Sequence, residues 1–222
     1  MVKYIINLIK SLKELLLVYL FQFIWLFILF LLKVDYNLLY LGIIGFNIII
    51  ICYLLRKKNI SFTVKDNYYP LASLGIGISL FFNMLIMLVF SNEVNNSINL
   101  FLVILSTGIV GPILEEMLFR KCLIDNLLKF NGKYKAVIVS SIIFSLVHSG
   151  IFTILYTFIL GIVLGYIYLK YRDIKASMIV HIMANLIVIF VYDFNVYILL
   201  FSFIVLMLSI LMIRKDKTLH LN

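Results

Sequence analysis

The sequence contains few charged residues and no polar stretch long enough to form a separate soluble domain. Charged side chains make up 13% of its 222 residues, whereas 64% of the residues are hydrophobic. A soluble domain of this size would leave much of that apolar surface in water. Apolar runs of 18 or more residues instead recur from end to end. We therefore expect a single integral membrane domain over residues 1–222, an all-α polytopic bundle of about eight transmembrane helices.

Cysteine is also scarce, and no small-residue cleavage site follows the first apolar run. The two cysteines, Cys52 and Cys122, fall near the ends of different apolar segments that we assign to the cytosolic side. A structural disulfide is not expected there. The first run, over residues 15–32, is longer than the core of a signal peptide, so we expect a retained helix. The net charge of +9 follows from basic residues that flank apolar spans, which argues against nucleic-acid binding.

Hydropathy and basic flanking residues together predict the membrane topology. All but one of the 19 lysine and arginine residues fall in segments that this layout places inside the cell, and the exception is Lys33. Because cytoplasmic loops are enriched in Lys and Arg, we expect a multi-pass protein of the cell membrane with both termini cytoplasmic. The expected spans cover residues 15–32, 36–55, 70–90, 98–125, 136–149, 151–171, 176–192 and 196–213.

Two adjacent carboxylates and an arginine, Glu115, Glu116 and Arg120, interrupt an otherwise apolar run. A charge in the hydrocarbon region costs at least ~2.5–3.5 kcal/mol on insertion scales, so each charge needs a partner or a chemical role. On a helix, Glu116 precedes Arg120 by four residues, which is the favourable order for an ion pair. Glu115 is rotated by ~100° from that face and is the candidate for chemistry. Gly111-Pro112 is expected to relax this helix and free a carbonyl.

Two histidines and an asparagine also lie within apolar helical segments. His148 follows Phe144 by four residues, and Asn185 follows His181 at the same spacing, so each pair shares a helical face. A rise of ~1.5 Å per residue, counted from the nearest cytosolic charge, places Glu115 and these three polar side chains in the cytosolic half of a ~30 Å core. We therefore expect the four residues to share one cavity.

This set of side chains has the composition of a hydrolytic site. Glu115 can act as a general base toward water, and His148 can hold and orient that water. His181 and the Asn185 amide can donate hydrogen bonds to a developing oxyanion. The interpretation without chemistry is that the histidines bond to neighbouring backbone and that Asn185 joins helices through its amide. The phenylalanines of the motifs, Phe144 among them, are interpreted as packing residues.

Three motifs, in order on separate helices, carry a family resemblance: Glu-Glu-x-x-x-Arg at 115–120, Phe-x-x-x-His at 144–148 and His-x-x-x-Asn at 181–185. Together they resemble the CPBP intramembrane proteases, the family of CAAX proteases and bacteriocin-processing enzymes. Its relatives include type II CAAX prenyl endopeptidases and Abi-type bacteriocin self-immunity proteins. The motif-bearing core covers about residues 98–195, and the spans before it are only generically compatible. The resemblance implies an intramembrane endopeptidase.

The resemblance also implies roles for individual residues. Glu115 would activate water with His148 in a mechanism without a cofactor, which we favour. Glu115, His148 and His181 could instead ligate zinc with one open position, although the sequence has no His-Glu-x-x-His helix. The catalytic residues implied are Glu115, His148, His181 and Asn185, with Glu116 and Arg120 in a supporting role.

The expected partners are a peptide or membrane-protein substrate and the lipid bilayer. Bacteriocin self-immunity and maturation of a secreted peptide are both compatible roles. A prenylated substrate is a lesser option, because the bias toward Ile, Asn, Lys and Tyr is typical of a low-GC bacterium. The alternative is a non-catalytic membrane scaffold that binds a sensor kinase, a transporter or a bacteriocin. A proton- or ion-coupled transporter is disfavoured, because the sequence shows no inverted repeat.

Overall fold

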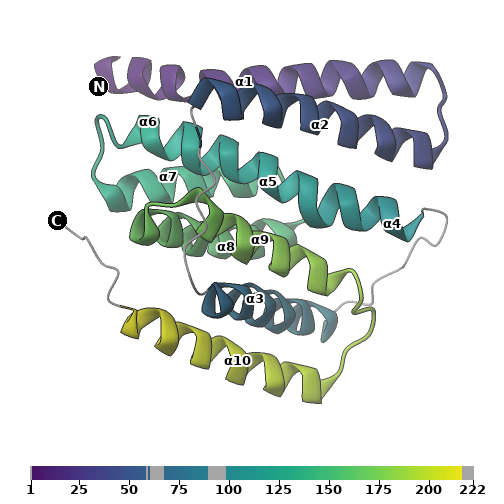
Figure 1. Cartoon of the computed structure of the whole chain (residues 1–222), viewed down its shortest axis with the longest axis vertical. Coiled ribbons are helices and arrows are strands. Elements are labelled where there is room, and N and C mark those ends of the chain that lie inside the picture. The colour runs from purple at the N-terminus through teal and green to yellow at the C-terminus, as the bar shows by residue number, and fades with distance from the viewer. Residues whose placement is uncertain (1, 59, 61–67, 90–98, 217–222) are drawn as a thin grey trace. The chain divides into compact units, whose positions relative to one another are not determined.

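The computed structural model describes residues 2–58, 60, 68–89 and 99–216, and these residues form helices without any strand (Figure 1). The predicted all-α class is therefore confirmed for the described chain. Its helical elements are α1 (Val2–Leu31), α2 (Tyr36–Lys58), α3 (Tyr69–Met87), α4 (Leu100–Val103), η1 (Ile104–Val110), α5 (Gly111–Glu116), η2 (Met117–Ile124), α6 (Asp125–Leu127), α7 (Lys133–Leu146), α8 (Ile151–Tyr171), α9 (Ile174–Val188) and α10 (Val196–Lys215).

Six helical stretches in the described chain are long and apolar enough to cross a membrane, by length and composition. They are α1, α2, α3, α8, α10 and the continuous stretch from α4 to α6. The protein is thus a multi-pass membrane protein, as predicted. The expected fifth and seventh spans form helices as well, but α7 has 14 residues and α9 has 15. At ~1.5 Å per residue, these two helices are shorter than a ~30 Å hydrocarbon core.

The turns between the last four helices lie where the sequence predicts them. Gly150 adopts a φ of 87° between α7 and α8, a left-handed conformation that favours glycine. Asp173 caps α9 by accepting a hydrogen bond from the Lys175 amide at 3.0 Å. Asn195 caps α10 by accepting one from the Tyr197 amide at 2.9 Å. Both caps satisfy backbone donors that helix starts leave without intrahelical partners. The segments between the expected second, third and fourth spans lie mostly outside the described residues.

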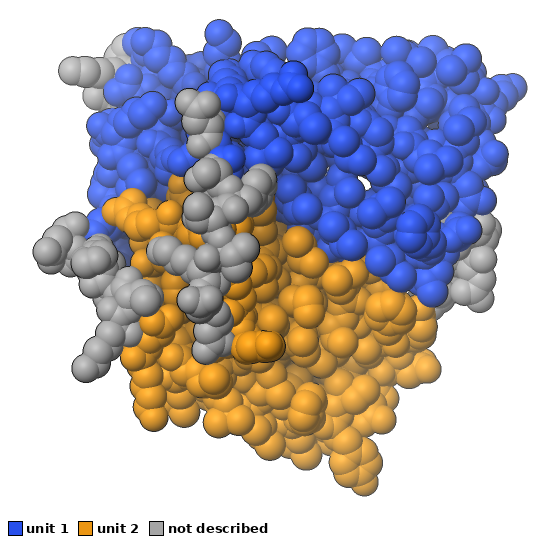
Figure 2. All heavy atoms as spheres, viewed as in Figure 1, with its two compact units in different colours: residues 1–61, 96–140 blue, residues 62–95, 141–222 orange. Residues whose placement is uncertain are grey.

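The chain divides into two compact units, coloured separately in Figure 2. Unit 1 comprises residues 1–61 and 96–140, and unit 2 comprises residues 62–95 and 141–222. The boundary between residues 140 and 141, where the chain passes from unit 1 to unit 2, falls inside α7. The single integral domain expected from the sequence stays a prediction.

In unit 1, the two N-terminal helices pack against the helix that carries the paired carboxylates. α1 contacts α2 and η2, and α2 contacts α4, η1 and α5. A small apolar cluster of Ile44, Leu102 and Val110 joins α2 to this helix. At one end, the Glu14 carboxylate bridges the two N-terminal helices through ion pairs with Lys57 at 2.8 Å and Lys58 at 3.0 Å.

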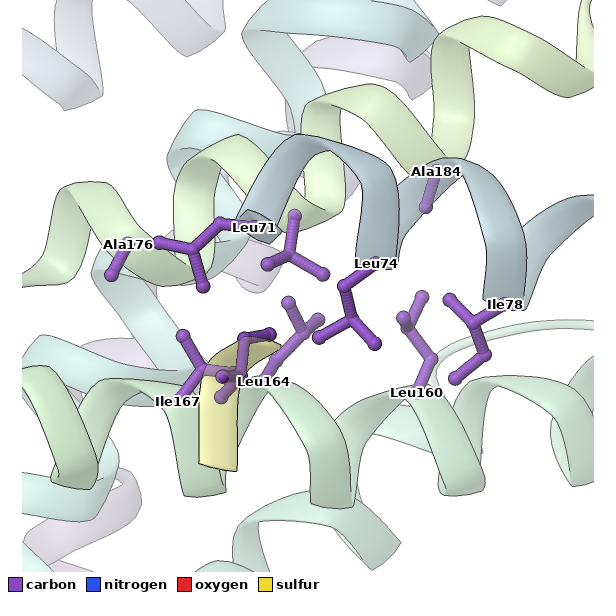
Figure 3. Close-up of a cluster of buried hydrophobic side chains, with 10 residues drawn as sticks. Leu71, Leu74, Ile78, Leu160, Leu164, Ile167, Ala176 and Ala184 are labelled. Carbon is purple, nitrogen blue, oxygen red and sulfur yellow. The ribbon is translucent and has the colours of Figure 1, made fainter. Parts of the chain in front are cut away.

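In unit 2, α3 packs against both α9 and α10, and α8 packs against α9. Leucine and isoleucine side chains of α3 and α8 meet the small residues Ala176 and Ala184 of α9 in one buried cluster (Figure 3). Gly75 of α3 permits close contact with α9, because a Cβ built there would lie 2.2 Å from the Val180 carbonyl oxygen. Gly161 of α8 has a similar role, since its Cβ would lie 3.0 Å from the Ser141 Cβ.

Candidate functional site

The helix that carries the paired carboxylates contains two π-helical segments, η1 and η2, on either side of α5. The Gly111 amide donates to the Ser106 carbonyl five residues earlier, which is the hydrogen-bond spacing of a π-turn. The following Pro112 has no amide hydrogen to donate. This local widening is the relaxation that the Gly111-Pro112 pair predicts. Pi-helical turns inside α-helices occur frequently at functional sites.

The predicted ion pair between Glu116 and Arg120 is present. The Arg120 Nη1 lies 3.1 Å from the Glu116 Oε1, and both side chains are almost fully buried. Such a pair neutralises two charges that the apolar interior would otherwise disfavour. It also joins the last residue of α5 to the first turn of η2, directly after Glu115.

Glu115 lies in α5 and is partly buried. Its negative charge acts on two nearby groups of unit 1, the Arg120 guanidinium and the phenol of Tyr19. The Tyr19 ring in turn lies 6.5 Å from the ring of Phe119, centroid to centroid. The carboxylate proposed as the base is therefore within electrostatic range of a cation and of a tyrosine of the first helix.

His148 lies just after the end of α7 rather than inside a helix, contrary to the sequence interpretation. Its Nδ1 is 2.8 Å from the Phe144 carbonyl oxygen. A carbonyl oxygen only accepts, so Nδ1 carries the hydrogen in this bond, and the neutral ring keeps its lone pair on Nε2. The partly buried imidazole is thus held in the tautomer that can accept a proton or orient water.

His181 is buried in α9, and it is linked to His148 through one aromatic ring. The Phe144 ring makes edge contacts with both imidazoles, at centroid distances of 4.9 Å to His148 and 5.7 Å to His181. Asn185 follows His181 by one helical turn on α9 and is partly buried. Phe144 is fully buried, in agreement with the packing role assigned from the sequence, and its ring packs against both histidines.

The predicted constellation is thus distributed between the two units. Glu115 and the supporting ion pair lie in unit 1, whereas His148, His181 and Asn185 lie in unit 2. The structure brings the two histidines onto one aromatic ring, and the assembly of all four residues in one cavity stays a prediction. No three His, Cys, Asp or Glu side chains gather into a metal-binding group within the described ranges. The zinc alternative therefore depends on residue types alone.

Tyr19 is the neighbour of Glu115 that sequence reasoning missed. It is one of 14 tyrosines in the chain, and nothing in the pattern of the first apolar run distinguishes it. The motifs that predict the site begin far along the chain, at Glu115. The packing of α1 against η2 places its ring beside Phe119, four residues after Glu115.

Part of this chain is similar to a known protein family. The family described as type II CAAX prenyl endopeptidase Rce1-like matches residues 97–187. A protein of Bacillus subtilis (strain 168) named "Putative membrane peptidase YdiL" is 32% identical over 88 residues. That alignment covers 40% of this chain and 36% of the relative, so the chain spans about a third of the relative's length. No solved structure matches the chain at a significant level. The predicted family resemblance is confirmed over the matched segment.

Proposed function

We propose, from the premise that residues 97–187 belong to the Rce1-like family, that this membrane protein is an endopeptidase that cleaves a peptide or membrane-proximal protein. The proposal rests on the position of the family match in the chain. It contains all four predicted catalytic residues, Glu115, His148, His181 and Asn185. The one curated relative described above is also named as a membrane peptidase.

The proposed reaction is hydrolysis by an activated water. Glu115 takes a proton from water while the water oxygen attacks the scissile carbonyl carbon. His148 orients that water through Nε2, a role supported by its hydrogen bond from Nδ1 to the Phe144 carbonyl. His181 and Asn185 donate hydrogen bonds to the oxyanion. The carbon–nitrogen bond then breaks, and Glu115 returns the proton to the leaving amine.

The test is cleavage of quenched fluorescent peptides, each with an apolar segment, by protein purified in detergent micelles. We expect Glu115→Ala and His148→Ala to lower the rate at least ~100-fold, since general acid–base groups contribute this much or more. Glu14→Gln is the matched control, because Glu14 is an acid of the same unit that pairs with lysines. A Glu115→Ala protein that cleaves like wild type would reject the proposed mechanism.

The same assay separates the glutamate mechanism from the zinc alternative. If Glu115, His148 and His181 ligated zinc, the ion would supply Lewis-acid activation of water. A chelator would then abolish cleavage, and added zinc would restore it. We propose the metal-free mechanism, for which cleavage is insensitive to chelator while the Glu115 and His148 variants remain inactive.

For the biological role, we propose self-immunity against a bacteriocin or maturation of a secreted peptide. The alternative is a non-catalytic scaffold that binds a partner protein, and the two proposals predict different effects of Glu115→Ala in cells. Under the peptidase proposal, Glu115→Ala loses protection or maturation together with cleavage. Under the scaffold alternative, the variant keeps its cellular effect although it cleaves nothing.

We also propose that both termini face the cytoplasm, as the basic flanks of the helices indicate. A single cysteine introduced as Lys215→Cys, with Cys52 and Cys122 replaced by serine, tests this orientation. A membrane-impermeant maleimide should label it only after the cells are opened. Labelling of intact cells would show that the C-terminal end of α10 lies outside the cell, contrary to the proposed topology.

A further inference from the structure

Tyr19 of the first helix packs against the helical stretch that carries the carboxylate proposed as the base. α1 packs against η2, the segment that directly follows the paired glutamates. The Tyr19 ring lies 6.5 Å from the ring of Phe119 at an interplanar angle of 58°. Phe119 is fully buried and follows Glu115 by four residues. The tyrosine is thus held by aromatic packing beside the catalytic stretch.

Tyr19 also interacts electrostatically with Glu115. The charge of the Glu115 carboxylate acts on the Tyr19 phenol. A phenol hydroxyl in an apolar environment needs a hydrogen-bond partner, because an unsatisfied polar group there costs free energy. The two buried residues nearest to Tyr19 on α1, Leu15 and Val18, are apolar. Phenylalanine would give the same ring packing at position 19, so packing alone does not account for the hydroxyl.

We propose that Tyr19 is a positioning residue of the active site, whose hydroxyl donates a hydrogen bond to the Glu115 carboxylate and orients it toward the water. This inference rests on the proposed function, in which Glu115 is the base. Catalytic hydrogen bonds are commonly long in the free enzyme and shorten when substrate binds. The first helix lies outside the family segment 97–187, so the N-terminal part of the chain contributes directly to the site.

The first test removes only the hydroxyl, with Tyr19→Phe, and measures cleavage of the quenched fluorescent peptides. A hydrogen bond to a charged group corresponds to about a tenfold effect, so we expect kcat to fall about tenfold. KM should change less than about twofold, because the hydroxyl acts on the base rather than on the substrate. Tyr40→Phe is the matched control, since Tyr40 packs in the Ile44 cluster of the same unit, and it should leave both constants unchanged.

The second test measures the Tyr19–Glu115 contact without any substrate. Melting temperatures of wild type, Tyr19→Phe, Glu115→Ala and the double variant form a double-mutant cycle. We expect the two shifts to be non-additive, because Tyr19→Phe removes nothing further once the carboxylate is absent. Tyr40→Phe combined with Glu115→Ala should give additive shifts.

The two tests distinguish the failure of this inference from the failure of the proposed function. Additive Tyr19–Glu115 shifts, or a Tyr19→Phe protein with wild-type kcat, overturn the positioning role. Non-additive shifts in a wild-type protein that cleaves none of the peptides support the contact, and it is then the peptidase proposal that fails. Non-additive shifts together with the lower kcat and unchanged KM establish the role.

Discussion

Arg120 and Glu116 form a buried ion pair across the junction of α5 and η2, with the Arg120 Nη1 3.1 Å from the Glu116 Oε1. Both residues come from one continuous helix, so the pair cannot join distant elements of the fold. Its effect is local, because it holds the helix turn on which Glu115 lies. The net stabilisation from a buried pair of this kind is small, because the cost of removing both charges from water offsets their attraction.

Removing one partner of this pair should be costly. Arg120→Met takes the cation away from a buried carboxylate, and we expect a loss of about 3–5 kcal/mol in the free energy of unfolding. Denaturant titration of the purified protein in micelles measures the loss. The control is Lys121→Met on the same helix, where Lys121 pairs with Asp125 at 3.1 Å and both side chains are about one-third exposed. Lys121→Met should lower the free energy of unfolding by no more than ~1 kcal/mol. Equal losses in the two variants would show that burial does not make the Glu116–Arg120 pair more important.

The spacing of charges predicted this pair because a helix fixes which residues share a face. The same rule identified the helix face of His181 and Asn185. It was wrong for His148, because it assumed that α7 continues to residue 149, whereas the helix ends at Leu146. The end of a short apolar helix has no strong sequence signal when the residues beyond it are equally apolar.

Other features of the site depend on contacts that no local pattern encodes. The edge contacts of the Phe144 ring with His148 and His181 join two helices that are separate in sequence. The contact between α1 and η2 that brings Tyr19 to Glu115 is likewise tertiary. Hydropathy predicted helices at the fifth and seventh spans, but it placed their ends at residues 149 and 192, whereas α7 ends at Leu146 and α9 ends at Val188, because hydropathy measures apolarity and not where a helix ends.

Phe144 offers a test of how the two histidines are held. Phe144→Leu keeps an apolar side chain but removes the ring that both imidazoles contact. We expect peptide cleavage to fall at least about tenfold, since small misplacements of catalytic groups are costly. Histidine NMR signals of both His148 and His181 should shift. Phe82→Leu removes an aromatic contact with Phe81 elsewhere in unit 2 and should leave cleavage and these signals unchanged.

Lys170 provides a prediction about the end of the last helix. Its buried ammonium donates to the Ile213 carbonyl, and the neighbouring Tyr171 hydroxyl donates to the Asp216 carboxylate at 2.9 Å. Lys170→Met should therefore lower the free energy needed to open the last turn of α10 by about 1.5–3 kcal/mol. This is the usual range for a hydrogen bond with a charged partner. Hydrogen exchange should accelerate at the last amides of α10. Lys215→Met, at an exposed position in the same turn, is the control and should leave exchange unchanged.

The close contact between Gly75 and Val180 connects the core of unit 2 to the candidate site. A Cβ at Gly75 would lie 2.2 Å from the Val180 carbonyl oxygen, and Val180 directly precedes His181. Because a backbone atom cannot rotate away, Gly75→Ala should shift α9 and cost about 1–3 kcal/mol of unfolding free energy. Cleavage should fall as well, since α9 carries His181 and Asn185. Gly45→Ala is the control, because no atom lies within 4 Å of the Cβ built there and alanine favours helix. A Gly75→Ala protein with wild-type stability and cleavage would show that α9 tolerates displacement at this point.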